Sequence, residues 1–147
     1  MESRAVTLEL LGTNEQEVAY IAGLFDGEGW ISAKSEHLLP ITSRKIVTGI
    51  KMSTPEPMLF CSRIFGGQVR PRQTKPRCKQ LHEWLLWAKK AEVFLRVIEP
   101  YLIVKKDKAN LALAFLACPR GISPKKLELA ELITPHIGRK LELPESP

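Results

Sequence analysis

Two acidic residues stand directly after a long uncharged stretch of the chain. Residues 18–25 carry no charge, and the sequence Asp-Gly-Glu-Gly follows at residues 26–29. Thr13 with Gln16, or Asn14 with Glu17, has the capping-box spacing, which predicts that a helix begins at residues 13–14. This helix is expected to end in the tetrapeptide, with its glycines in a left-handed C-cap. Carboxylates at a helix C-terminus face the negative end of the helix dipole, at a cost of about 0.3–1 kcal/mol each when exposed. A divalent cation would reverse that cost. A metal site is therefore one interpretation, and a solvent-exposed turn is the other.

The elements that must position these acids are predicted by hydrophobic periodicity and capping signals. In residues 44–53, Ile46 and Ile50 alternate with Lys45 and Lys51, which predicts a strand with one core face and one basic face. Residues 81–87 fit either a helix or a buried strand, and a strand is favoured. The expected elements are a helix at 14–28, strands at 30–35 and 44–53, a helix capped at residue 53 and running to about 65, strands at 68–72 and 81–87, and helices at 89–98, 106–117 and 123–134.

The helix before the acids is apolar around its whole circumference, which predicts burial on more than one side. Val18, Ile21 and Phe25 form a bulky stripe suited to a core. A second stripe consists of small residues that would let another backbone approach closely: Ala19, Ala22 and Gly23. This small stripe is the predicted contact for a second helix.

Basic residues are concentrated in the middle of the chain. The 147 residues include 22 Lys and Arg against 16 Asp and Glu, a net charge of +6. Between Lys34 and Lys79 there are ten bases and two acids, a surplus of +8, so the rest of the chain carries −2. A cationic segment beside near-neutral flanks indicates a surface for a polyanion. A solvated basic face without a partner is the alternative.

Several classes of protein and site are disfavoured by what the sequence lacks. An apolar content of 44% suits one domain spanning residues 1–147, with a core at about 14–117 and a helical extension at about 123–134. No apolar run approaches the roughly 18 residues of a membrane span, so no membrane partner is expected. The three cysteines lack a C-x-x-C spacing, so we expect reduced thiols in the cytoplasm or another reducing compartment. There is no P-loop, hence no expected nucleotide cofactor, and no carboxylate-x-lysine nuclease core.

Residues 21–29, Ile-Ala-Gly-Leu-Phe-Asp-Gly-Glu-Gly, resemble the nine-residue signature of the LAGLIDADG homing endonucleases. The Ala-Gly-Leu core, the acidic sixth and eighth positions and the final glycine all agree with it. Residues 100–105 (Pro-Tyr-Leu-Ile-Val-Lys), with Ala-Asn-Leu at 109–111, look like the family's downstream segment with its active-site lysine. Phe-Gly-Gly at 65–67 before a strand also agrees, and the resemblance covers about residues 14–116.

The resemblance implies an α+β fold in the order αββαββα, with a curved antiparallel sheet in the DNA major groove and here an extra C-terminal helix. It implies a cation such as Mg²⁺, which prefers oxygen ligands, held by Glu28 and Gly27 from each of two signature helices. Lys105 would orient water or stabilise developing negative charge. Asp26 would act as a supporting or capping residue, and Thr54 would organise water.

The implied function is a homing endonuclease of intron or intein mobility, making metal-dependent double-strand breaks at a long, near-palindromic DNA site. A chain with one signature helix would act as a homodimer. Two alternatives stay open: a catalytically inactive DNA-binding regulator and an RNA-splicing maturase. Trp84 and Trp87 are expected in the core. The residues expected to contact double-stranded DNA are Lys34, Lys45, Lys51, Gln68, Arg70, Arg72, Lys75, Arg77 and Lys79.

Overall fold

The computed structural model describes residues 3–35, 44–72 and 75–135. Its elements are α1 (Arg4–Leu11), α2 (Glu15–Glu28), β1 (Gly29–Ser35), β2 (Arg44–Met52), α3 (Glu56–Phe65), β3 (Val69–Arg72), β4 (Leu81–Trp87), α4 (Ala88–Ile98), the 3₁₀ turn η1 (Glu99–Tyr101), α5 (Lys106–Ala117) and α6 (Pro124–Ile133). From α2 to α4 the order is αββαββα, as expected. The helix α1, which the sequence did not predict, precedes it. None of the described helices is both long and apolar enough to cross a membrane.

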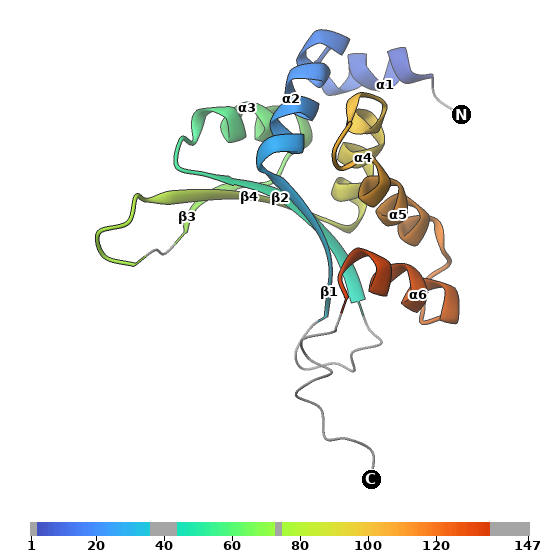
Figure 1. Cartoon of the computed structure of the whole chain (residues 1–147). Coiled ribbons are helices and arrows are strands. Elements are labelled where there is room, and N and C mark those ends of the chain that lie inside the picture. Colours follow the sequence, from blue (N-terminus) through green and yellow to red (C-terminus); the bar gives the residue numbers. More distant parts are fainter. Residues whose placement is uncertain (1–2, 36–43, 73–74, 136–147) are drawn as a thin grey trace.

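The four strands form one antiparallel sheet in the spatial order β1-β2-β4-β3. Figure 1 shows a curved sheet with α1 to α5 on one side and α6 at the far end of β1. The acidic end of α2 runs directly into β1. The sheet therefore begins at the predicted catalytic residues and leads away from them.

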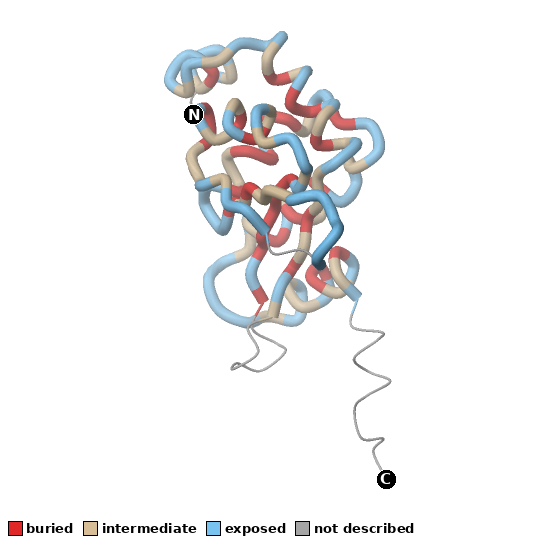
Figure 2. Tube along the Cα trace, turned by 90° about the vertical axis from the view of Figure 1, so that its left-hand side faces the viewer, coloured by how far each residue is buried: buried red, intermediate tan, exposed pale blue. Residues whose placement is uncertain are grey.

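The core lies between the sheet and the helices, where the buried segments of Figure 2 gather. Phe94 of α4 stands at its centre and makes edge-to-face contacts with three rings, at centroid distances of 5.3 Å to Phe25, 4.9 Å to Phe65 and 5.1 Å to Trp84. Such pairs are worth about 0.5–1.5 kcal/mol each beyond their buried area. Phe25 belongs to α2 and directly precedes Asp26, so the helix that ends in the acids is anchored in the core next to them.

The predicted helix start and strands are confirmed. The Asn14 side chain caps α2 by accepting the backbone N–H of Glu17 at 2.9 Å. Residues 81–87 form the strand β4, not a helix. In β2, Ile46 and Ile50 are buried and the two lysines are exposed.

Two predicted caps were wrong. Gly29 has an extended backbone (φ −88°) instead of a left-handed one. Glycine is required there for a different reason, because a Cβ on Gly29 would stand 2.1 Å from Cδ1 of Phe25. The helix α3 begins after Pro55 and has no side-chain cap, so Ser53 does not serve as one.

The C-terminal helix α6 is fastened to the sheet by Arg44, whose side chain is 2% exposed. Its guanidinium donates to the backbone oxygens of Ala33 (2.9 Å), Ala130 (3.2 Å) and Thr134 (2.6 Å), and it pairs with Glu131 at 2.7 Å. Thr134 also accepts the backbone N–H of Ala33 through its hydroxyl at 2.9 Å. The extension therefore covers the outer edge of β1, which would otherwise present unpaired backbone groups.

Candidate active site and nucleic-acid interface

Asp26 lies in the last turn of α2, and both of its carboxylate oxygens are engaged. Oδ2 accepts the backbone N–H of Ile103 (2.8 Å) and Oδ1 that of Lys105 (3.0 Å), while Nζ of Lys105 donates to the backbone oxygen of Asp26 (2.6 Å). Burial raises the pKa of Asp26, but the backbone donors and the Lys105 charge together outweigh it and leave the pKa below its ordinary value of 3.8. Asp26 thus ties the end of α2 to the segment before α5 and holds Lys105 beside it.

Glu28 is the last residue of α2, and its side chain is exposed. Residues two positions apart on a helix point about 200° apart, so Glu28 faces away from the side that Asp26 occupies. Within residues 3–35, 44–72 and 75–135, no group hydrogen-bonds or pairs with its carboxylate. Glu28 is therefore available to a ligand in a way that Asp26 is not.

The oxygens at this helix end suit a hard divalent cation. They are the carboxylate of Glu28 and the terminal carbonyls of α2, that of Gly27 among them, at the negative end of the helix dipole. No group of three or more His, Cys, Asp or Glu residues that could hold a metal is present in the described part of the chain. The donor set fits such an ion but is incomplete, so a second chain, a phosphate and water would have to complete it.

The exposed side of α2 differs from the predicted small stripe. Ala22 is fully buried in the core of its own chain, so its assignment to an interface was wrong. Ala19 is partly exposed, and Gly23 and Gly27 are exposed, with nothing within 4 Å of a Cβ built on either glycine. We call the exposed row of α2 the open stripe: Gln16, Tyr20, Gly23 and Gly27.

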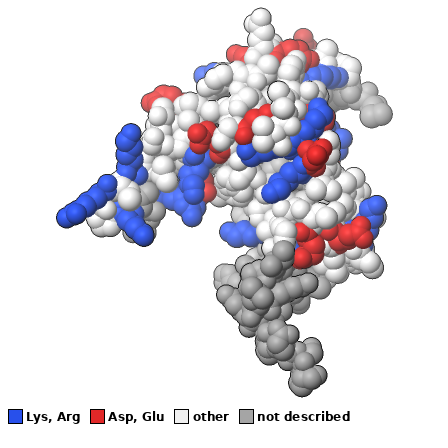
Figure 3. Space-filling model, viewed as in Figure 1, with Lys and Arg blue, Asp and Glu red and all other residues white. Residues whose placement is uncertain are grey.

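The sheet face turned away from α2–α5 carries the basic strand residues, and we call it the open face. Cross-strand partners share a face, so Lys34 stands beside Lys45, and Glu83 stands between Lys51 and Arg70. Figure 3 shows basic side chains gathered at the end of the molecule formed by β3 and β4. The open face consists of Trp30, Ser32, Lys34, Lys45, Val47, Gly49, Lys51, Arg70, Arg72, Leu81, Glu83, Leu85 and Trp87, and the exposed residues Lys75, Arg77 and Lys79 lie between β3 and β4.

One acid on the open face, Glu83, was not predicted from the sequence. Glu83 accepts from Nη1 of Arg72 at 2.9 Å, and its side chain is 17% exposed. It lies just outside the basic segment 34–79, and the pairing of β4 with β2 and β3 is what places it among the bases. Beside it, Arg70 donates from Nη2 to the side-chain oxygen of Gln68 at 2.7 Å. These contacts fix the orientation of two arginines expected to contact DNA.

No family model and no curated protein matches the chain, but solved structures do. It is similar to the crystal structure of the homing endonuclease I-CvuI in complex with its target (TM-score 0.64, 22% identity, 91% of this chain and 89% of that chain). It is also similar to the homing endonuclease I-TnaI (0.60, 17%, 85% and 95%) and to the archaeal intron-encoded homing endonuclease I-Vdi141I complexed with DNA (0.55, 18%, 69% and 67%). The chain has the homing-endonuclease fold.

Three further predicted residues have their places in this homing-endonuclease fold. Thr54 is exposed in the link between β2 and α3, and no described residue hydrogen-bonds to it. Trp84 is fully buried, as expected, but Trp87 is 42% exposed, so its assignment to the core was wrong. Residues three apart on a strand point to opposite faces, and Trp87 consequently lies on the open face.

Proposed function

We propose that the chain is a LAGLIDADG homing endonuclease that acts as a homodimer and cleaves both strands of a long, near-palindromic DNA site with a divalent cation such as Mg²⁺. The observation that carries the proposal is the exposed carboxylate of Glu28, which no described residue pairs with, at the end of a core-anchored helix where the open basic face begins. The DNA complexes of I-CvuI and I-Vdi141I, and the magnesium or calcium present with I-CvuI, support it.

The residues of this site would divide the chemistry between them. Glu28 and the Gly27 carbonyl would hold the cation, which when bound activates water and offsets charge on the scissile phosphate. Lys105 would place its ammonium group near that phosphate and stabilise the charge that develops there. Asp26 would act as a positioning residue through Lys105, and Thr54 would orient water from the link between β2 and α3.

Binding would use the open face and the basic loop at its tip. Lysines and arginines that neutralise phosphates release counterions, so affinity should fall steeply with salt. Arginine can also pair with both acceptors of guanine in the major groove. We assign Lys34, Lys45, Lys51, Gln68, Arg70 and Arg72 to the groove and adjacent phosphates, and Lys75, Arg77 and Lys79 to the backbone.

The homodimer proposal is supported by apolar surface around the open stripe. Tyr20 of α2 is 52% exposed, Leu59 of α3 is 53% exposed, and Ile103 and Val104, next to the end of α2, are 85% and 75% exposed. Exposed apolar groups beside two exposed glycines indicate a packing surface for a second copy. Gly23→Leu should weaken self-association at least tenfold in sedimentation equilibrium, because the side chain fills the space a second helix would use.

The matched control for this dimer test is Ala114→Leu, which adds a similar side chain at an exposed position of α5. It should leave the association constant unchanged. If Gly23→Leu associates as tightly as the wild type, the open stripe is not the interface.

The test of catalysis compares Glu28→Gln with Glu9→Gln, an exposed acid on α1. A duplex that the wild type selects from a randomised library would be used to measure binding and magnesium-dependent cleavage separately. Glu28→Gln should bind the duplex within about twofold of the wild-type affinity. Its cleavage rate should fall by more than the roughly 10- to 100-fold that is typical when a residue behind a metal ligand is replaced. Glu9→Gln should match the wild type. Tight wild-type binding without cleavage would indicate the inactive regulator, and preference for RNA the maturase.

A further inference from the structure

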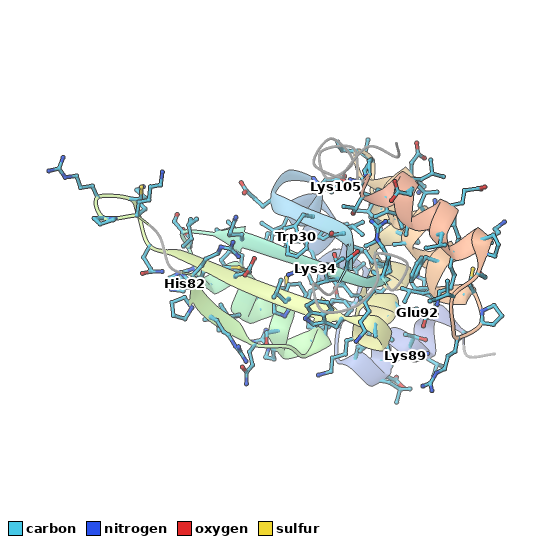
Figure 4. The ribbon with its side chains drawn as sticks, turned by 90° about the horizontal axis from the view of Figure 1, so that it is seen from below. Trp30, Lys34, His82, Lys89, Glu92 and Lys105 are labelled. Carbon is cyan, nitrogen blue, oxygen red and sulfur yellow. The ribbon has the colours of Figure 1, made fainter. Side chains whose placement is uncertain are left out.

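Apolar side chains occupy the middle of the open face, between its basic ends. Trp30, Gly49 and Leu85 stand side by side on β1, β2 and β4, and the next row pairs Val47 with Trp87. Trp30 and Leu85 are partly exposed, and Trp87 is 42% exposed. Figure 4, which looks onto this side of the sheet, places Trp30 near its middle.

Packing among the described residues does not account for these exposed surfaces. A Cβ on Gly49 would stand 3.3 Å from Cζ2 of Trp30 and 2.9 Å from Cδ2 of Leu85, so these side chains close over the glycine. Together with Trp87 they nevertheless line a hollow of about 650 Å³ that opens to solvent. Exposed apolar surface that is contiguous across neighbouring strands is one mark of a binding site.

The charges around this hollow indicate the kind of partner. Lys34 and Lys51 line it, and Nζ of Lys34 lies 5.9 Å from the centre of the Trp87 ring. The acid in the lining, Glu83, is paired with Arg72. A cationic rim favours a polyanion, and an apolar floor requires that the polyanion also present an apolar group. Duplex DNA meets both conditions, because the thymine C5-methyl is the apolar group exposed in its major groove.

We infer that Leu85 and Trp87, flanked by Trp30, contact thymine C5-methyl groups in the major groove and thereby set part of the target specificity. The inference rests on the proposed function and names one determinant of its substrate. It means that each half of the target contains thymines, opposite the middle of the open face, whose methyl groups strengthen binding. Because 5-methylcytosine carries its methyl at the same position of the pyrimidine ring, it should partly replace thymine there.

The test uses the duplex selected by the wild type, with each thymine replaced in turn by deoxyuridine, which lacks only the methyl. Loss of one buried methyl contact should weaken binding about fourfold at one or more positions in each half-site. Leu85→Ala and Trp87→Ala should weaken binding to the thymine duplex and remove the difference between thymine and uracil. Leu10→Ala, an exposed leucine on α1, should preserve that difference.

Each outcome decides the inference. If uracil binds as well as thymine at every position, or if the uracil penalty persists in both alanine variants, the inference is wrong and the proposed function stands. If the wild type selects no duplex, both fail. Leu85→Met keeps an apolar contact at the same place and should retain most of the thymine preference, which separates loss of contact from loss of folding.

Discussion

Asp26→Asn separates a structural carboxylate from a metal-binding one. The carboxylate accepts two backbone N–H groups, at 2.8 Å from Ile103 and 3.0 Å from Lys105. An amide keeps one acceptor oxygen and turns its NH₂ toward the second donor, so one charge-assisted bond is lost. Such a bond contributes about 1.5–3 kcal/mol, and because water can reach this half-exposed site, we expect a loss of about 1–2 kcal/mol at pH 7. The thermal midpoint should fall by about 2–8 °C.

The pH dependence of this loss has a definite sign. Because the folded pKa of Asp26 lies below the ordinary value of 3.8, its carboxylate stabilises the fold above that value. The contribution disappears as the pH falls through the folded pKa. Urea denaturation of wild type and Asp26→Asn at several values between pH 7 and pH 3 should therefore give curves that converge toward acid.

The metal requirement gives the second half of the test. The magnesium concentration for half-maximal cleavage should stay near the wild-type value in Asp26→Asn, whereas the single-turnover rate should fall because Lys105 is less well held. Glu28→Gln should keep the wild-type free energy of unfolding but lose magnesium-dependent cleavage. If Asp26→Asn is as stable as the wild type but needs far more magnesium, Asp26 is a ligand and the structural assignment is wrong.

Three further substitutions or modifications test other parts of the structure. Arg44→Met should lower the free energy of unfolding, measured by urea denaturation, by about 3–5 kcal/mol, since it leaves buried carbonyl oxygens without a donor. Replacing the exposed Arg120 by Met should change that free energy little. Similar losses in the two variants would contradict the role of Arg44. Burial raises the pKa of Cys61 to about 12, so at pH 8 a thiol reagent should label exposed Cys78 in the native protein and Cys61 only after unfolding. Peptide mapping measures the labelling of each cysteine. Equal labelling of Cys61 and Cys78 would show that the core around Cys61 opens readily. Arg77→Gln should reduce the slope of log Kd against log salt by about one and keep the preferred sequence; a changed preference would indicate a base contact.

Features set by neighbours along the chain could be predicted from the sequence. The helix at 106–117 has the expected bounds, because Pro100 and Pro119 flank a segment of good helix formers. The start of α2 follows from the Asn14 cap, and the two faces of β2 follow from strict alternation. Each of these depends on interactions within about ten residues, and such interactions leave a pattern in the sequence.

Features set by distant partners could not be predicted. The donors to Asp26 lie 77 and 79 positions away, and the backbone oxygens of Ala130 and Thr134, which accept from Arg44, lie 86 and 90 positions away. The helix α1 buries only Leu8 and is held by Arg4, which pairs with Glu15 at 2.9 Å. The cap at Ser3 is a local indication of α1, but without the Arg4–Glu15 ion pair it is too weak to predict the helix.

The different surroundings of the Asp26 and Glu28 side chains follow from helix geometry once one face of α2 is known. Asp26 lies one turn after Ala22, which is buried, so it must face the chain's own interior and find partners there. Glu28 follows Gly27 of the open stripe and must face outward. A stripe that runs through Gly23 and Gly27 and leaves out Ala22 thus accounts for both the partly buried Asp26 and the exposed Glu28. It also sets a condition on the dimer, because two Glu28 carboxylates can share one site only if the two copies of α2 run in the same direction along that stripe.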